Sequence, residues 1–228
     1  MKNVLVTGGA GPFAKKIVQR LIDDKWHVLL SDADFDAVEA ICNDFGAEHA
    51  SPMRLDASRL DDVKSVITKA VAERGAIVGL VNAYGNRDGA DVGAFTELDP
   101  GYWRRVVDNN LRSVLNCCYA MIPHMIEVGG GSIVSLSAFE GLRGSPSGAV
   151  FSAASAGTIV FTQVLSRECL PHKIRVNSLL PPAPEIAGAR LNEDLALPVA
   201  EAVAHLLSDR AAATTGACLD VTGGIALH

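Results

Sequence analysis

The stretch VLVTGGAGPFAKKIV (residues 4–18) joins an apolar run, a glycine-rich turn and the beginning of a helix. In this context a turn presents backbone N–H groups and a helix N-terminus to a phosphate. Residues 9–14 fit the pattern G-x-G-x-x-A. The stretch therefore predicts an α/β fold with a dinucleotide site after its first strand.

Short β-rich runs alternate with longer segments of helical period along the rest of the chain. This alternation predicts parallel strands joined by right-handed helical crossovers. We expect Asp34, Ser58 and Asp99 to be helix N-caps. The expected strands lie at residues 3–8, 27–32, 48–56, 77–83, 131–137, 173–181 and 217–223. The expected helices lie at residues 12–24, 34–45, 58–74, 100–128, 148–170 and 197–208.

The composition is that of an ordinary globular protein, with 49% hydrophobic and 20% charged residues. No run approaches the roughly 18 uninterrupted apolar residues of a membrane span, and no signal peptide is recognisable. The net charge of −6 and the lack of a basic run argue against nucleic acid as a partner. We expect a cytoplasmic protein that binds neither nucleic acid nor a membrane.

The cysteines and histidines predict no metal site. The five cysteines show no C-x-x-C spacing and do not form an even set, which disfavours both zinc and a disulfide framework. The six histidines are scattered and show no H-x-x-x-H spacing. Buried, reduced thiols are the expected state of the cysteines.

A carboxylate at the end of the second expected strand bears on the choice of cofactor. Asp32 lies 21 residues after Gly11, where it can bond ribose hydroxyls and repel a 2′-phosphate. This favours NAD over NADP. Pro12 weakens the prediction, because proline has no N–H for a phosphate. The alternative is a structural glycine turn with Asp32 as a helix-capping residue.

No linker or fixed-period repeat divides the chain, so residues 1–228 are predicted to form a single domain. The proline-rich stretch after the sixth expected strand is its most irregular part. Ligands of open parallel sheets bind beyond the carboxyl ends of the strands. We therefore expect residues 182–198 to form a short substrate loop or lid.

With these motifs in place, the sequence resembles the short-chain dehydrogenase/reductase family over nearly its whole length. The family motif T-G-x-x-x-G-x-G corresponds to residues 7–14, and L-V-N-N-A-G corresponds to residues 80–85. The closing V-x-G-G matches residues 221–224. The resemblance implies a Rossmann-type fold: about seven strands in a doubly wound parallel sheet, with helices on both faces. The cofactor-binding residues that it implies are Gly8, Gly11, Pro12, Asp32, Asp56, Ala57 and Asn82.

The family's catalytic tetrad is formed by a serine, a tyrosine, a lysine four residues beyond it and a helical asparagine. Alignment of IVSLSAFEG (residues 133–141) puts Ala138 at the serine, Phe151 at the tyrosine and Ser155 at the lysine, while Asn110 is retained. In the family the ammonium lowers the phenol pKa from about 10, so that the phenol exchanges a proton near neutral pH. Phe151 has no proton to exchange, so the standard hydride-transfer chemistry is expected to be lost or atypical.

Two interpretations of the function remain open. The chain is either a degenerate member that serves as a binding or assembly subunit or runs a non-standard reaction, or a working NAD(H)-dependent oxidoreductase on a small carbonyl or alcohol. In the second case Tyr84, Glu140 or water supplies the proton. Glu140 is expected in the loop after the fifth expected strand, beside the substrate mouth. Tyr84 stands where the family usually has a small residue, and a plug of the pocket is the favoured interpretation of this tyrosine over a relocated acid. A shift of one residue would offer Ser137, but alternate strand residues face opposite sides.

The expected helices 100–128 and 148–170 carry apolar residues on more than one face. Such a helix is deeply buried or packs against another subunit. Members of the family pair these helices in dimers and tetramers. We therefore expect a homo-oligomer, or a pairing with a related subunit, in addition to a small-molecule ligand.

Overall fold

The strands form one parallel sheet in the order β3-β2-β1-β4-β5-β6-β7, and the computed structural model describes residues 1–85, 94–182 and 193–224. All six strand pairs are parallel. The strand order reverses between β1 and β4, which is the position where open α/β sheets bind ligands. The predicted Rossmann-type sheet is therefore confirmed.

Each expected strand is present, with ends that differ by a few residues. The strands are β1 (Lys2–Thr7), β2 (Trp26–Asp32), β3 (Ala50–Arg54), β4 (Ile77–Asn82), β5 (Gly131–Leu136), β6 (Ile174–Leu180) and β7 (Cys218–Asp220). The central strands β1, β4 and β5 are almost wholly buried, as expected of strands covered on both faces.

The helices also follow the expected ranges. They are α1 (Ala14–Asp23), α2 (Phe35–Phe45), α3 (Leu60–Arg74), α4 (Pro100–Val107), α5 (Ser113–Glu127), α6 (Glu140–Arg143), α7 (Ala149–Cys169) and α8 (Glu193–Leu207). Asp34 and Asp99 cap α2 and α4, because their carboxylates accept the N–H groups of Ala37 and Tyr102, each at 3.1 Å.

The structure differs from the prediction in three details. The helix expected at 100–128 contains a π-helical segment, η2 (Asp108–Arg112), between α4 and α5. Ser58 does not cap α3, since its hydroxyl donates to Asp56 Oδ1 instead. The loop expected after β5 contains the short helix α6. The expected lid stays a prediction, since residues 183–192 of it lie outside the described residues; its last residues, from Glu193 onward, belong to α8.

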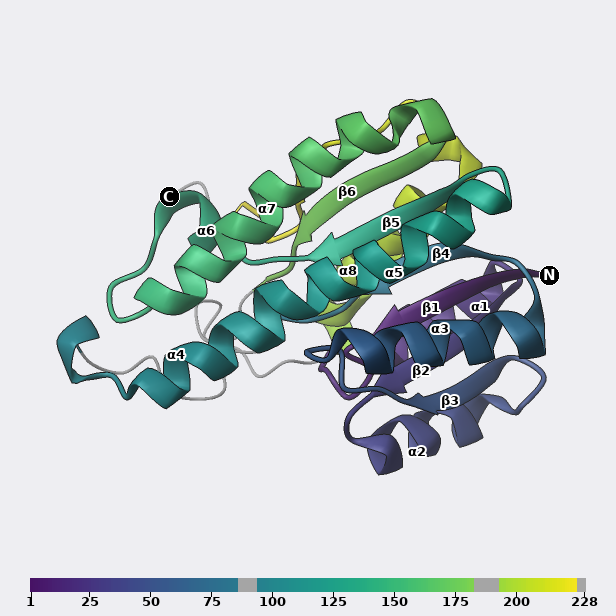
Figure 1. Ribbon diagram of the computed structural model, residues 1–228, viewed down its shortest axis with the longest axis horizontal. Coiled ribbons are helices and arrows are strands. Elements are labelled where there is room, and N and C mark those ends of the chain that lie inside the picture. The colour runs from purple at the N-terminus through teal and green to yellow at the C-terminus, as the bar shows by residue number, and fades with distance from the viewer. Residues whose placement is uncertain (86–93, 183–192, 225–228) are drawn as a thin grey trace.

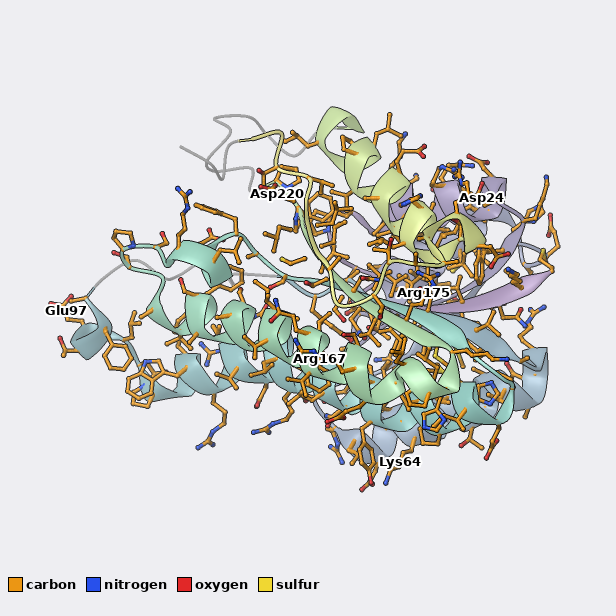
Figure 2. The ribbon with its side chains drawn as sticks, turned by 90° about the horizontal axis from the view of Figure 1, so that it is seen from above. Asp24, Lys64, Glu97, Arg167, Arg175 and Asp220 are labelled. Atoms are coloured by element: carbon orange, nitrogen blue, oxygen red, sulfur yellow. The ribbon has the colours of Figure 1, made fainter. Side chains whose placement is uncertain are left out.

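Helices cover both faces of the sheet. Helices α3, α5 and α7 lie over the face seen in Figure 1, while α1 and α8 lie behind the sheet. Figure 2, from above, shows the sheet between these two helical layers. Alternate residues of each strand enter different cores: Val4 and Val6 pack with α1 and α8, and Leu5 packs with α3 and α5.

Helix α7 is unusually apolar. By length and composition alone, Ala149–His172 would suffice to cross a membrane. In this fold, however, α7 packs against β6, α6, α4 and η2, so part of its apolar surface is covered by the chain itself. Core helices of folded domains often have this composition, and α7 is one of them.

Candidate functional site

A cleft of about 360 Å³ opens at the carboxyl ends of the strands, beside the reversal in strand order. It runs from the ends of β2 and β3, past the turn after β1, to the ends of β5 and β6. Its lining residues are Gly8, Ala10, Gly11, Pro12, Phe13, Asp32, Ala33, Leu55, Asp56, Ala57, Ser58, Ala83, Tyr84, Gly85, Asn109, Ser113, Leu136 and Pro181. The sequence-predicted cofactor residues are thus brought together, apart from Asn82.

Glycine is required at the beginning of the turn after β1. Gly8 has a φ of +75°, which L-residues rarely adopt. A Cβ there would lie 2.9 Å from the backbone C and O of Ala83, at the end of β4. Gly8 therefore lets the turn and the end of β4 approach each other and shape the cleft floor.

The backbone N–H groups of the turn are mostly used within the protein. Gly9 N–H donates to Ser31 O at 2.9 Å, and Gly11 N–H donates to Gly8 O at 3.1 Å. Pro12 has no N–H to offer. Phe13, directly before α1, keeps an N–H without an acceptor among the described residues. This donor at the N-terminus of α1 is suited to an anion.

Asp32 lies at the rim of the cleft in a fixed orientation. Its Oδ2 accepts the N–H of Ala10 at 3.1 Å, and its Oδ1 accepts the N–H of Asp34 at 3.0 Å. A carboxylate has about four acceptor positions, so two remain for a ligand hydroxyl. Asp32 therefore links the glycine turn to β2 and does not cap α2, which is the role of Asp34.

Asp56 and Ser58 form the neighbouring wall, just beyond β3. Asp56 Oδ1 accepts both the hydroxyl of Ser58, at 2.6 Å, and its N–H, at 3.1 Å. The N–H of Asp56 donates to Asp62 Oδ2 at 2.7 Å. Ala57 lies buried beside them. These bonds hold the loop in one conformation and place a second carboxylate at the cleft.

Asn82 lies beneath the cleft and does not line it. Its Nδ2 donates to Ser135 Oγ at 3.0 Å, and its Oδ1 accepts the hydroxyl of Thr7 at 3.3 Å. Asn82 is completely buried. It therefore joins the ends of β1, β4 and β5, a structural role that supports the cleft floor from below.

Tyr84 lines the cleft and also packs on the buried cluster beneath the sheet. Burial raises the pKa of its phenol well above the usual value of about 10, although a hydrogen bond to Thr7 opposes this shift. The phenol is therefore neutral at physiological pH. This shift is opposite to the one that makes a phenol an effective proton-transfer group near neutrality.

The four tetrad positions lie outside the residues that line the cleft. Phe151 is only 2% exposed and packs in a small apolar cluster with Tyr102, Val106 and Ala138. Ser155, one turn further along α7, is 3% exposed. Asn110 is buried in η2, where its Nδ2 donates to Val106 O at 2.9 Å. Among the described residues, these four positions bring no ionisable side chain together.

Two hydrogen bonds around these positions were missed by sequence reasoning. Ser137 donates to the backbone O of Ser155 at 2.9 Å. Thr158 donates to the backbone O of Asn110 at 3.2 Å. They tie α7 to the end of β5 and to η2. A hydroxyl in a sequence gives no signal of such a distant backbone acceptor, so only the structure reveals these bonds.

Glu140 begins α6 and is almost completely buried, although sequence reasoning placed it in a loop at the substrate mouth. Its side chain does not line the cleft. Helix α6 packs closely on α7, where Gly141 leaves no room for a Cβ because Ala156 N would lie 2.7 Å away. Glu140 is therefore oriented by this helix contact and lies away from the cleft.

Comparisons with known proteins agree with this architecture. The pattern of the short chain dehydrogenase family matches residues 2–192. The 3-oxoacyl-[acyl-carrier-protein] reductase FabG of Chlamydia trachomatis is 30% identical, covering 99% of this chain and 97% of its own. The FabG of Staphylococcus epidermidis is 28% identical, covering 98% of both chains.

A solved structure shows the same fold. The 3-ketoacyl-(acyl-carrier-protein) reductase of Brucella melitensis, complexed with NADH, superimposes with a TM-score of 0.89 at 27% identity. The match covers 99% of this chain and 98% of that reductase. Together with the family match over residues 2–192, the fold and the cleft establish that this chain belongs to the short-chain dehydrogenase family.

Proposed function

We propose that the cleft binds a nicotinamide dinucleotide, with NAD preferred over NADP, and that the family's proton-transfer machinery is lost. The observation that carries this proposal is that the cofactor-binding part of the site is retained while the proton-donating part is replaced. The cofactor-type residues Gly8, Asp32 and Asp56 line a common cleft, while the position of the proton-donating tyrosine holds the buried Phe151.

The residues present fit the adenosine and phosphate parts of such a cofactor. Asp32 has acceptor positions for ribose hydroxyls, and its charge repels a 2′-phosphate. Phe13 offers an N–H at the start of α1 to the pyrophosphate. Bound nicotinamide would supply hydride chemistry. The relative from Brucella melitensis binds NADH, which supports the same class of ligand here.

The proposed loss of catalysis rests on side-chain chemistry. General acid–base catalysis contributes about 10² to 10⁴ in rate. Phe151 has no exchangeable proton, and Ser155 cannot replace an ammonium that lowers a phenol pKa. Tyr84 is the tyrosine that lines the cleft among the described residues, and burial raises the pKa of its phenol. These properties favour a binding or assembly subunit over an efficient reductase.

Calorimetric titration with NADH and NADPH, followed by a panel of ketones and alcohols, tests the proposal. We expect NADH to bind at least tenfold more tightly than NADPH, with no turnover. The competing hypothesis is a working oxidoreductase that uses Tyr84 or Glu140. Turnover that disappears in Tyr84→Phe or Glu140→Gln would support that hypothesis and contradict ours.

We also propose that the chain associates with a second copy through the outward faces of α5 and α7. Tyr119 on α5 is 65% exposed, and Val160 and Val164 on α7 are 57% and 48% exposed. Exposed apolar faces of this kind mark interaction surfaces. Sedimentation velocity should show a dimer or tetramer, and Val160→Asp should shift it towards the monomer. A monomeric wild-type chain would contradict this proposal.

A further inference from the structure

We propose that hydrogen bonds centred on His27 hold the start of β3 on the sheet only while this histidine is neutral, so that mildly acidic pH opens this edge of the sheet. Strand β3 is the outermost strand beside β2 (Figure 1). The bonds lie at the amino ends of the strands, and the cleft lies at their carboxyl ends. This inference is therefore independent of what the cleft binds.

The proton of the His27 ring has a defined position. Nδ1 lies 3.1 Å from the backbone O of Glu48, which can only accept, so Nδ1 carries the proton and donates it. In the neutral ring, Nε2 is then an acceptor. Ser51 Oγ lies 3.0 Å from Nε2 and therefore donates its hydroxyl to the ring. His27 is only 1% exposed, so water has little access to these bonds.

The hydroxyl of Ser51 is oriented from its other side by the last residue of α3. Arg74 Nη2 donates to Ser51 Oγ at 2.8 Å, and a guanidinium has no acceptor to offer in return. The backbone O of Arg74 accepts Asn3 Nδ2 at 2.8 Å, which ties the end of α3 to β1. The bonds therefore run in one direction, from Arg74 through Ser51 and His27 to the backbone of Glu48.

A proton on Nε2 would break this order. Ser51 would face two donors, Nε2 and the guanidinium of Arg74, and its own hydroxyl would lose its acceptor. Burial lowers the pKa of His27; the bond to Glu48 O opposes this shift, and the charges of Arg74 and His49 add to it. The carboxylate of Glu48 faces His49, with 3.7 Å between Oε1 and Nε2. The protonated ring would thus be a buried cation beside other positive charge.

The segment held by these bonds is bounded at both ends. Gly46 precedes it with a φ of +84°, and its backbone O accepts the N–H of Ala50 at 3.1 Å. Beyond β3, the N–H of Leu55 donates to Asp32 O at 2.9 Å. We therefore expect residues 47–53 to open as a unit, while the cleft wall at Leu55 stays in place. Opening would expose the outer edge of β2 to solvent.

Hydrogen exchange of the full chain at pH 7.0 and pH 5.5, corrected for intrinsic rates, tests this inference. Residues 47–53 should exchange about tenfold or more faster than β5, because they open without the rest of the sheet. A freed His27 has a pKa of about 6.5, so the opening constant should rise by up to about eightfold between the two pH values. Equal exchange in the two segments, or a rise of less than twofold, would overturn the proposal.

His27→Gln is the informative variant, because a glutamine side chain offers a donor and an acceptor but does not titrate. In this variant the opening constant of residues 47–53 should change by less than twofold between the two pH values. His205→Gln is the matched control, since His205 is exposed on α8, and it should keep the wild-type response. A wild-type response in His27→Gln would contradict the proposal.

Nitrogen-15 NMR of the histidine rings tests the same bonds in the wild-type chain, whether or not the variant folds. At pH 7 we expect the His27 ring to be protonated on Nδ1 and unprotonated on Nε2. On acidification the ring should take up its second proton below pH 6.5, because burial lowers its pKa. A ring protonated on Nε2 at pH 7, or one that titrates at or above pH 6.5, would show that the proposal is wrong.

Discussion

Replacing Phe151 by tyrosine would add a hydroxyl at the position where the family carries its proton donor. Phe151 is 2% exposed and is surrounded by Tyr102, Val106, Val150 and Ala138. In this buried cluster the new hydroxyl loses its contact with water. We therefore expect Phe151→Tyr to destabilise the fold without creating activity.

The size of this effect follows from the burial. An unsatisfied buried hydroxyl costs about 1–3 kcal/mol. In a domain of about 150–250 residues, 1 kcal/mol lowers the melting temperature by about 2–4 °C. Phe151→Tyr should therefore lower the melting temperature by about 2–12 °C, and urea unfolding should show a lower midpoint with an unchanged slope.

Phe95→Tyr is the matched control. Phe95 is 50% exposed and stacks on Trp103 with ring centroids 4.9 Å apart, so its new hydroxyl can reach water. Its free energy of unfolding should change by less than about 0.5 kcal/mol. If Phe151→Tyr is as stable as the wild type, the position is open and still suited to a phenol, and the reasoning about the buried cluster fails.

Two further predictions concern the turn after β1 and a buried histidine. Gly8→Ala should destabilise the fold by about 1–3 kcal/mol more than Gly75→Ala. Both glycines have a positive φ, but only at Gly8 would a Cβ meet backbone atoms. Equal losses of unfolding free energy in urea would refute this prediction. Burial lowers the pKa of His27 in the folded chain. As the pH falls below about 6.5, His27 therefore binds a proton in the unfolded chain before it does so in the folded chain, and the free energy of unfolding should decrease. His27→Gln should lose less stability between pH 7 and pH 5, and parallel melting curves for the two proteins would count against this assignment.

Much of the fold was predictable because it depends on local patterns. Alternating strand and helix periods are read directly from the side chains, and Asp34 and Asp99 act as caps through contacts three residues away. The glycine turn and Asp32 were also found from spacing alone, since the carboxyl ends of parallel strands meet at one edge of the sheet.

The features that the sequence did not reveal depend on contacts between distant segments. Asn82 matched a family motif, but its position beneath the cleft follows from its bonds to Thr7 and Ser135 on neighbouring strands. Glu140 was expected at the substrate mouth, and its burial is set by the packing of α6 on α7. A single sequence gives no direct signal of either arrangement.

The most direct test of the central claim is a single-turnover experiment. The chain is mixed in excess over NADH with each of a panel of ketones, and the absorbance of the reduced nicotinamide is followed. We predict that NADH is bound, as calorimetry under the same conditions would show, and that its absorbance decays no faster than without protein. Rapid oxidation of the bound NADH by any ketone would contradict the claim that this cleft has lost its proton donor.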